Sequence, residues 1–196
     1  MNLVNFVKIL YLGNENRRII NFLEQNNIVI IRNDRINNIE EIKDIDFIVS
    51  FGYRYLIKKE IVNEFHNRAI NLHISYLPWN KGADPNLWSF LDDTPKGGSI
   101  HFIDHELDEG DILCQYKIEY SDNDTLRTTY EMLIKKMEDL FIKYWDKIAT
   151  GKIIGIQQTD IGTYHKMADK KKYEYLLIDG WDTPVKYILG KAKVVE

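Results

Sequence analysis

Residues 7–31 read VKILYLGNENRRIINFLEQNNIVII. The apolar run 7–12 predicts a buried strand, residues 15–26 have the apolar spacing of a helix, and residues 28–31 predict a second short strand. A helix that joins two strands in this way forms a crossover, and strands connected by a crossover pair in parallel. The stretch therefore predicts an α/β fold with a doubly wound, mostly parallel sheet.

The remainder of the chain continues this alternation of strands and helices. Further strands are predicted at residues 46–51, 69–72, 99–103 and 112–118, and helices at 58–65, 85–91 and 124–149. Asp84 precedes Pro85 and is expected to cap the helix that starts there. The helix 124–149 has an apolar stripe suited to covering one face of the sheet. We expect one core domain over residues 1–150 and a small C-terminal appendage, residues 151–196, packed on it.

Composition excludes several classes of protein. The 196 residues are 44% hydrophobic and 29% charged, as in a soluble globular protein. No apolar run approaches the roughly 20 residues that a membrane span needs, and the N-terminus lacks the pattern of a secretory signal. The single Cys114 can form no internal disulfide. A net charge of −4 gives no general attraction to nucleic acid. We therefore expect a cytoplasmic location.

Three polar residues mark a candidate site. Asn71 and His73 are two positions apart at the end of a predicted strand, so they project from the same face. A turn rich in Gly, Pro, Asn and Asp follows at residues 75–85, and Asp108 lies in the later segment 107–113. An open α/β sheet binds its ligands in the loops at the carboxyl ends of its strands. The sequence thus places an amide, an imidazole and a carboxylate near such a position.

The order and spacing of these motifs resemble those of the folate-dependent formyltransferase family. Its Asn-x-His pair, its Ser-x-Leu-Pro-x-x-x-Gly turn and its Asp-x-Gly-Asp-Ile segment correspond to Asn71-Leu-His73, Ser75-Tyr-Leu-Pro-Trp-Asn-Lys-Gly82 and Asp108-Glu-Gly-Asp-Ile112. The resemblance runs from about residue 48 to residue 113. It implies a Rossmann-like formyltransferase core, a cis bond before Pro78, and N10-formyltetrahydrofolate as formyl donor.

The chemistry of formyl transfer gives each of the three residues a task. Asn71 can donate an N–H to the oxygen on which negative charge develops, and His73 can polarise the carbonyl or carry a proton. Asp108 is expected to orient His73 and to stabilise its cationic form. The reaction needs no metal. An alternative in which His101 and His105, with the nearby aspartates, hold a metal ion stays open, although the spacing matches none of the established zinc motifs.

The resemblance also implies where the formyl donor binds. It places the donor against residues 51–56 and the loop 103–108, with contacts from Arg54, Tyr55, Leu56, Ile103, Asp104 and Asp108. Considered without the resemblance, Tyr55 and Leu56 are equally well explained as core residues at the end of a strand.

Three acceptors are familiar in this family: glycinamide ribonucleotide, methionyl-tRNA and the amine of a nucleotide-linked amino sugar. We expect no C-terminal barrel of the kind that the tRNA enzymes carry, and residues 13–16 match the phosphate loop of the purine enzymes poorly. The turn 77–86 and the segment 162–165 look most like the sugar N-formyltransferases of polysaccharide biosynthesis. We therefore expect a small nucleotide-sugar substrate, with no nucleic-acid or membrane partner, and keep a homodimer as an option.

Acceptor contacts are expected from the turn. Trp79, Lys81 and Asn86 are the candidates, because a loop tryptophan can stack on a ring and a lysine can meet a phosphate. Two other functions stay open: a hydrolase of formyltetrahydrofolate, and a folate-binding module without catalysis. The sequence identifies neither the amino sugar nor its nucleotide.

Overall fold

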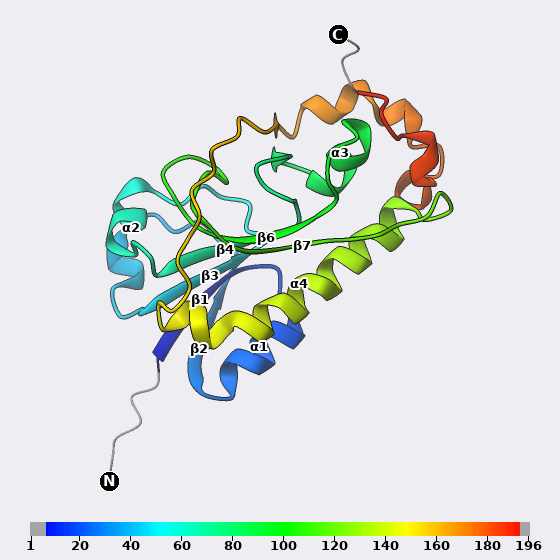
Figure 1. Ribbon diagram of the computed structural model, residues 1–196. Coiled ribbons are helices and arrows are strands. Elements are labelled where there is room, and N and C mark those ends of the chain that lie inside the picture. The colour runs from blue at the N-terminus through cyan, green and yellow to red at the C-terminus, as the bar shows by residue number, and fades with distance from the viewer. Residues whose placement is uncertain (1–6, 193–196) are drawn as a thin grey trace.

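The computed structural model describes residues 7–192 and contains a six-stranded sheet with strand order β2-β1-β3-β4-β6-β7 (Figure 1). Its strands are β1 (Val7–Gly13), β2 (Asn27–Arg32), β3 (Phe47–Phe51), β4 (Ala69–His73), β6 (Gly97–Phe102) and β7 (Ile112–Lys117). The first four pair in parallel, and β6 and β7 are antiparallel to their neighbours. The predicted mostly parallel α/β sheet is confirmed. Residues 1–6, part of the stretch on which the absence of a secretory signal was judged, lie outside the described residues.

The helices occupy the predicted segments with small shifts at their ends. They are α1 (Arg17–Glu24), α2 (Lys59–Glu64), α3 (Pro85–Leu91) and α4 (Leu126–Ala149). Short 3₁₀ helices are η1 (Ile39–Ile42), η2 (Asp169–Lys172), η3 (Glu174–Leu176), η4 (Gly180–Asp182) and η5 (Val185–Tyr187). Between residues 7 and 192, none of the helices combines the length and the apolar character required to cross a bilayer.

The helix α3 begins where predicted, with Asp84 at the N-cap position and Pro85 at the first helical position, but the side-chain cap is missing. The Asp84 side chain makes no capping hydrogen bond, and its backbone is left-handed, with φ 51°, whereas a capping residue is normally extended. The carboxylate instead lies 2.9 Å from the Lys170 amine in the C-terminal region.

Helices cover both faces of the sheet, so the molecule has three layers. Successive residues of β1 point to opposite faces: Ile9 and Tyr11 pack with residues of α1 and α4, and Leu10 and Leu12 pack with residues of α2 and η1. All four of these side chains are fully buried. Figure 1 shows α1 and α4 together on one side and α2 on the other.

The chain after α4 returns across the sheet towards α3 (Figure 1). Ile156 forms an antiparallel bridge with Ile112 at the start of β7. Further on, β8 (Tyr164–His165) pairs in parallel with β5 (Lys81–Gly82), which lies in the turn after β4. Val185 and Ile188 are then fully buried against residues of α3 and the first turn of α4. Residues 151–192 thus contact the loops at the ends of β4 and β6. The Leu77–Pro78 bond in the turn is cis, as the resemblance implied.

Candidate active site

Antiparallel pairing of β4 with β6 brings the polar residues of the site together. Asn71 on β4 stands opposite His101 on β6, so their side chains lie on the same face of the sheet. His73 follows Asn71 on that face, two residues further along β4. The loop between β6 and β7 then returns Asp108 to the same point. The structure therefore assembles all three predicted catalytic residues and adds His101.

Asp108 is the centre of this cluster and is only 6% exposed. Its Oδ1 accepts a hydrogen bond from the Asn71 amide at 3.2 Å, and its Oδ2 accepts one from the Gly82 backbone N–H at 2.9 Å. The Nε2 atoms of His101 and His73 lie 3.5 and 3.7 Å from the carboxylate oxygens. The Asp108 backbone is left-handed, with φ 57°, which is uncommon for a residue other than glycine.

The contacts of His101 fix its neutral tautomer. A carbonyl oxygen only accepts hydrogen bonds, so the 2.8 Å contact to the Phe102 carbonyl places a hydrogen on Nδ1 of His101. Its bare Nε2 then accepts from the Asn71 amide at 3.3 Å. Both amide hydrogens of Asn71 are therefore engaged, one with His101 and one with Asp108. For Asn71 to stabilise an oxyanion, substrate must displace one of these two acceptors.

From the sequence alone, His101 is a candidate only as a metal ligand. Its alignment with Asn71 across two antiparallel strands, which residues 69–73 and 97–102 form, would have revealed its place in the site. That alignment depends on strand register, and register was not predicted.

His73 is oriented by a different group from the one expected. Its Nε2 donates to the Asn80 carbonyl at 3.2 Å. The 3.7 Å separation from Asp108 is a charge contact, too long for a hydrogen bond. The expectation that Asp108 orients His73 directly is therefore corrected: the turn that follows β4 folds back over the ring and supplies a backbone carbonyl. Asp108 acts on His73 through its charge.

The protonation states follow from burial and from the neighbouring charges. Burial alone would raise the pKa of the Asp108 carboxyl, but His73, His101 and the Gly82 N–H together hold that pKa below its usual range. Burial lowers the pKa of His73 below its ordinary value of 6.5, and this effect outweighs the opposing effect of the Asp108 charge. At neutral pH the site thus contains an ionised carboxylate beside a neutral imidazole that can accept a proton.

Two cavities meet at Asn71 and Asp108, which line both of them. We call the larger one, about 530 Å³, the triad cavity, since His73 also lines it. The smaller one, about 250 Å³, is the loop cavity, which is lined by His101 and the loop after β6. All six residues expected to bind the formyl donor line one or both cavities: Tyr55, Leu56 and Asp108 line both, Arg54 the triad cavity, and Ile103 and Asp104 the loop cavity.

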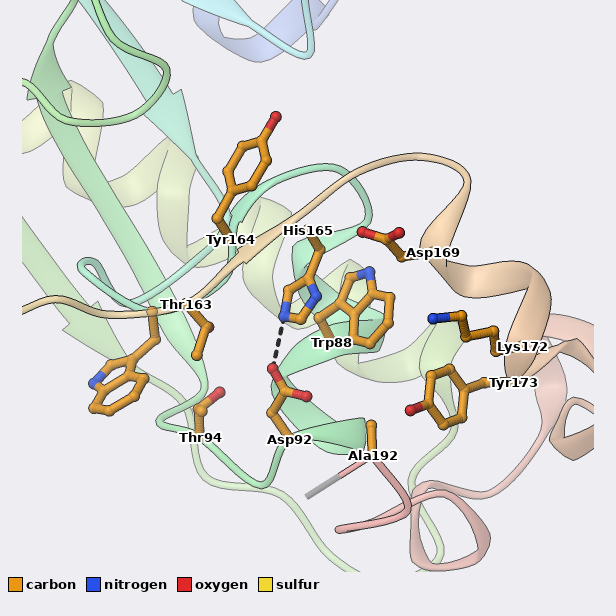
Figure 2. A pocket seen from close by; sticks show the side chains of 11 residues that line it. Trp88, Asp92, Thr94, Thr163, Tyr164, His165, Asp169, Lys172, Tyr173 and Ala192 are labelled. Carbon is orange, nitrogen blue, oxygen red and sulfur yellow. Dashed lines mark hydrogen bonds and ion pairs between the residues drawn. The ribbon is translucent and has the colours of Figure 1, made fainter. Parts of the chain in front are cut away.

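A third cavity of about 620 Å³ lies beside β8, and we call it the tail cavity (Figure 2). The rings of Trp88 and His165 stack there with centroids 3.7 Å apart, and His165 Nε2 lies 2.6 Å from the Asp92 carboxylate. Lys172 and Tyr173 reach into it from the C-terminal region. Tyr164 and His165 line both this cavity and the triad cavity, so the two share a wall.

The three residues expected to bind the acceptor substrate occupy different environments. Trp79 lines the tail cavity. Lys81 is only 3% exposed, and its amine pairs with the Glu109 carboxylate at 2.8 Å. Asn86 is also buried and donates its amide hydrogen to the Leu126 carbonyl. Neither Lys81 nor Asn86 lines any of the three cavities, because both side chains bind groups inside the protein. A substrate contact remains a prediction for Trp79 and has no geometric support for the other two.

The histidines once considered as metal ligands are separated in the structure. His101 belongs to the Asn71 and Asp108 network, whereas the backbone of His105 binds the Asp104 carboxylate. Across the described range 7–192, no three His, Cys, Asp or Glu residues are arranged to hold a metal ion.

Known proteins with similar sequences are formyltransferases. The family model described as formyl transferase matches residues 24–144, more than half of the chain. A methionyl-tRNA formyltransferase of Clostridium novyi (strain NT) is 34% identical over 137 residues, which cover 68% of this chain and 44% of that protein. The chain thus spans less than half the length of the curated relatives it matches.

Solved structures add a relative of matching length. The formyltransferase PseJ from Anoxybacillus kamchatkensis, in complex with UDP-4,6-dideoxy-4-formamido-L-AltNAc and tetrahydrofolate, is 55% identical with a TM-score of 0.93 and covers 95% of this chain and 100% of its own. A 4-N formyltransferase from Francisella tularensis, 24% identical with a TM-score of 0.75, shares the fold over 85% of this chain and 78% of its own. This chain belongs to the formyl transferase family.

Proposed function

We propose that this protein transfers the formyl group of N10-formyltetrahydrofolate to the amine of a nucleotide-linked amino sugar. The observation that carries the proposal is the position of Asn71 and Asp108, which line two adjoining cavities at once. A formyl donor and an amine that enter from different sides would meet at these residues. Family membership and the ligands of the 55% identical formyltransferase support the same reaction.

The loop cavity has the character of a site for a flat heterocycle. The aromatic and aliphatic residues Tyr53, Tyr55, Leu56 and Ile57 line it, together with the loop 103–108. Apolar walls with a few polar groups are typical of cofactor sites. Leu56 is 74% exposed at the rim shared with the triad cavity, so a bound ring would cover it. These residues fit the pterin end of the donor.

The protonation states of the site suit direct attack by an amine. Nε2 of neutral His73 donates to the Asn80 carbonyl, so Nδ1 accepts the proton of the amine as the amine attacks the formyl carbon. The ionised Asp108, 3.7 Å from the ring, then stabilises the imidazolium that forms. Asn71 donates to the oxygen that gains negative charge, exchanging one of its internal partners for that oxygen. The bond between the formyl carbon and N10 of the donor then breaks, and the His73 imidazolium returns the proton to N10. No side-chain nucleophile takes part.

The tail cavity offers a place for the nucleotide of the acceptor. Trp79 and Tyr173 provide aromatic surfaces and Lys172 provides a cation. Tyr164 and His165 line both cavities, so a ligand that extends past them could reach from one cavity into the other. Its amine would then lie in the triad cavity, and its base and phosphates in the tail cavity. A methionyl-tRNA acceptor is less well supported, since the net charge of −4 gives little attraction to a large polyanion.

The first prediction concerns the two groups that handle the proton. Asp108→Asn and His73→Ala should each lower kcat by about a hundredfold or more, because each removes one half of a coupled acid–base pair. The double variant should be little slower than the slower single variant, as expected for residues that act as a unit. Steady-state rates with a competent acceptor measure both effects. Multiplicative losses would show that the two residues act independently.

The acceptor itself can be identified by direct assay. Purified protein with N10-formyltetrahydrofolate and a panel of nucleotide-linked amino sugars should give a product heavier by one formyl group, as detected by mass spectrometry. Charged initiator tRNA and glycinamide ribonucleotide, tested in parallel, should stay unmodified. Efficient formylation of either, without turnover of any amino sugar, would overturn the proposed acceptor. Release of formate without any amine would instead identify a hydrolase.

Lys172 tests the placement of the nucleotide. A charge-assisted contact to phosphate contributes about 1.5 kcal/mol, so Lys172→Ala should raise the acceptor KM roughly tenfold and leave kcat nearly unchanged. Lys171→Ala is the matched control, because Lys171 is exposed and does not line the tail cavity. Equal effects of the two substitutions would place the phosphates elsewhere.

A further inference from the structure

The Gln158 side chain connects the C-terminal region to the loop that carries Asp108. Gln158 lies between Ile156, which bridges to β7, and β8. Its Nε2 donates to the carbonyl of Asp108 at 2.8 Å and to the carbonyl of Gly110 at 2.9 Å. Both hydrogens of one amide group are thus used on the backbone of a single turn.

The backbone of this turn, residues 108–110, is constrained at two positions. Asp108 has a left-handed backbone, φ 57°, a conformation that a residue with a Cβ rarely adopts. Gly110 lies so close to β6 that an added Cβ would be 1.9 Å from the Phe102 carbonyl oxygen. The turn is therefore tight, and the direction of the Asp108 side chain is set by the backbone conformation at that residue. Gln158 donates a hydrogen bond to the carbonyl of the same residue.

The Asp108 carboxylate depends on that direction for its own contacts. Its oxygens accept from the Asn71 amide at 3.2 Å and from the Gly82 N–H at 2.9 Å. A rotation of the backbone at Asp108 would move both oxygens away from these donors and from His73. Gln158 itself lines neither the triad cavity nor the loop cavity, so it acts on the site only through Asp108.

We propose that Gln158 is a positioning residue for formyl transfer, whose amide fixes the backbone of Asp108 and so aims the catalytic carboxylate. The proposal rests on the proposed function, in which Asp108 takes part in the reaction. It assigns to residues after α4 a part in the chemistry, in addition to their part in lining cavities.

Two substitutions separate positioning from simple packing. Gln158→Met keeps the volume of the side chain but removes both donors, and misplacement of a catalytic group by a fraction of an ångström should lower kcat about tenfold or more. The KM for the formyl donor should stay near the wild-type value. Gln157→Met is the matched control, because Gln157 is exposed and should tolerate the change. Wild-type kcat in Gln158→Met, at an unchanged melting temperature, would overturn the proposal.

Gln158→Glu adds a pH test. The introduced carboxylate would face two carbonyl oxygens, so kcat at neutral pH should fall further than in Gln158→Met. Once protonated at lower pH, the carboxylic acid regains one O–H donor, and kcat relative to wild type should partly recover. A side chain that only fills space would show no such recovery.

A substrate-free measurement keeps this proposal separate from the proposed function. The charge of Asp108 raises the pKa of His73, so a carboxylate that has turned away should let that pKa fall further below 6.5. NMR titration of the imidazole rings in Gln158→Met, with Gln157→Met as control, measures the change. A wild-type titration curve for His73 would refute the positioning role. Absence of formyl transfer by the wild-type protein would refute the proposed function while leaving this titration decisive.

Discussion

Asp108 is a carboxylate that is 6% exposed and ionised at neutral pH, and such a charge is tolerated inside a protein only when other groups compensate it. At neutral pH the compensation comes from N–H donors on two separate strands, the Asn71 amide on β4 and the Gly82 N–H on β5. The His73 and His101 rings lie 3.7 and 3.5 Å from the carboxylate oxygens, and in their cationic forms they hold the Asp108 pKa low. The pKa in the folded protein lies below the unfolded value of about 3.8. The carboxylate therefore stabilises the fold above that pH, and this contribution is lost as the pH falls through the folded pKa.

The same compensation explains why residues after α4 belong to the site. Gly82 can present its N–H to Asp108 because β5 is held by β8, through hydrogen bonds from Lys81 to the Thr163 carbonyl and from Ala83 to the His165 carbonyl. A Cβ at Gly82 would lie 2.3 Å from that His165 oxygen, so the two strands approach too closely for another residue. The carboxylate thus depends on the pairing of β5 with β8, and Gly82, Tyr164 and His165 of these strands also line the triad cavity.

Local sequence patterns were sufficient to predict the sheet. They also predicted that Asn71 and His73, two residues apart on one strand, lie on the same face of it. Features set by tertiary packing were not predictable. His101 requires the register of β4 against β6, and the burial of Lys81 requires the position of Glu109 in a distant loop. Asp84 occupies the N-cap position, but its backbone is left-handed there and its side chain makes no capping hydrogen bond. For His101 and Lys81 the decisive partner lies far away in sequence.

The central claim is that the buried Asp108 stays charged because its neighbours hold it so. NMR titration of side-chain carboxyl carbons, with the Asp108 signal assigned by its loss in Asp108→Asn, measures this directly in the ligand-free protein. Our account predicts that the Asp108 signal stays at the position of an ionised carboxylate down to the lowest pH at which the protein remains folded. Titration of that signal near the ordinary value of about 3.8, or above it, would contradict the account.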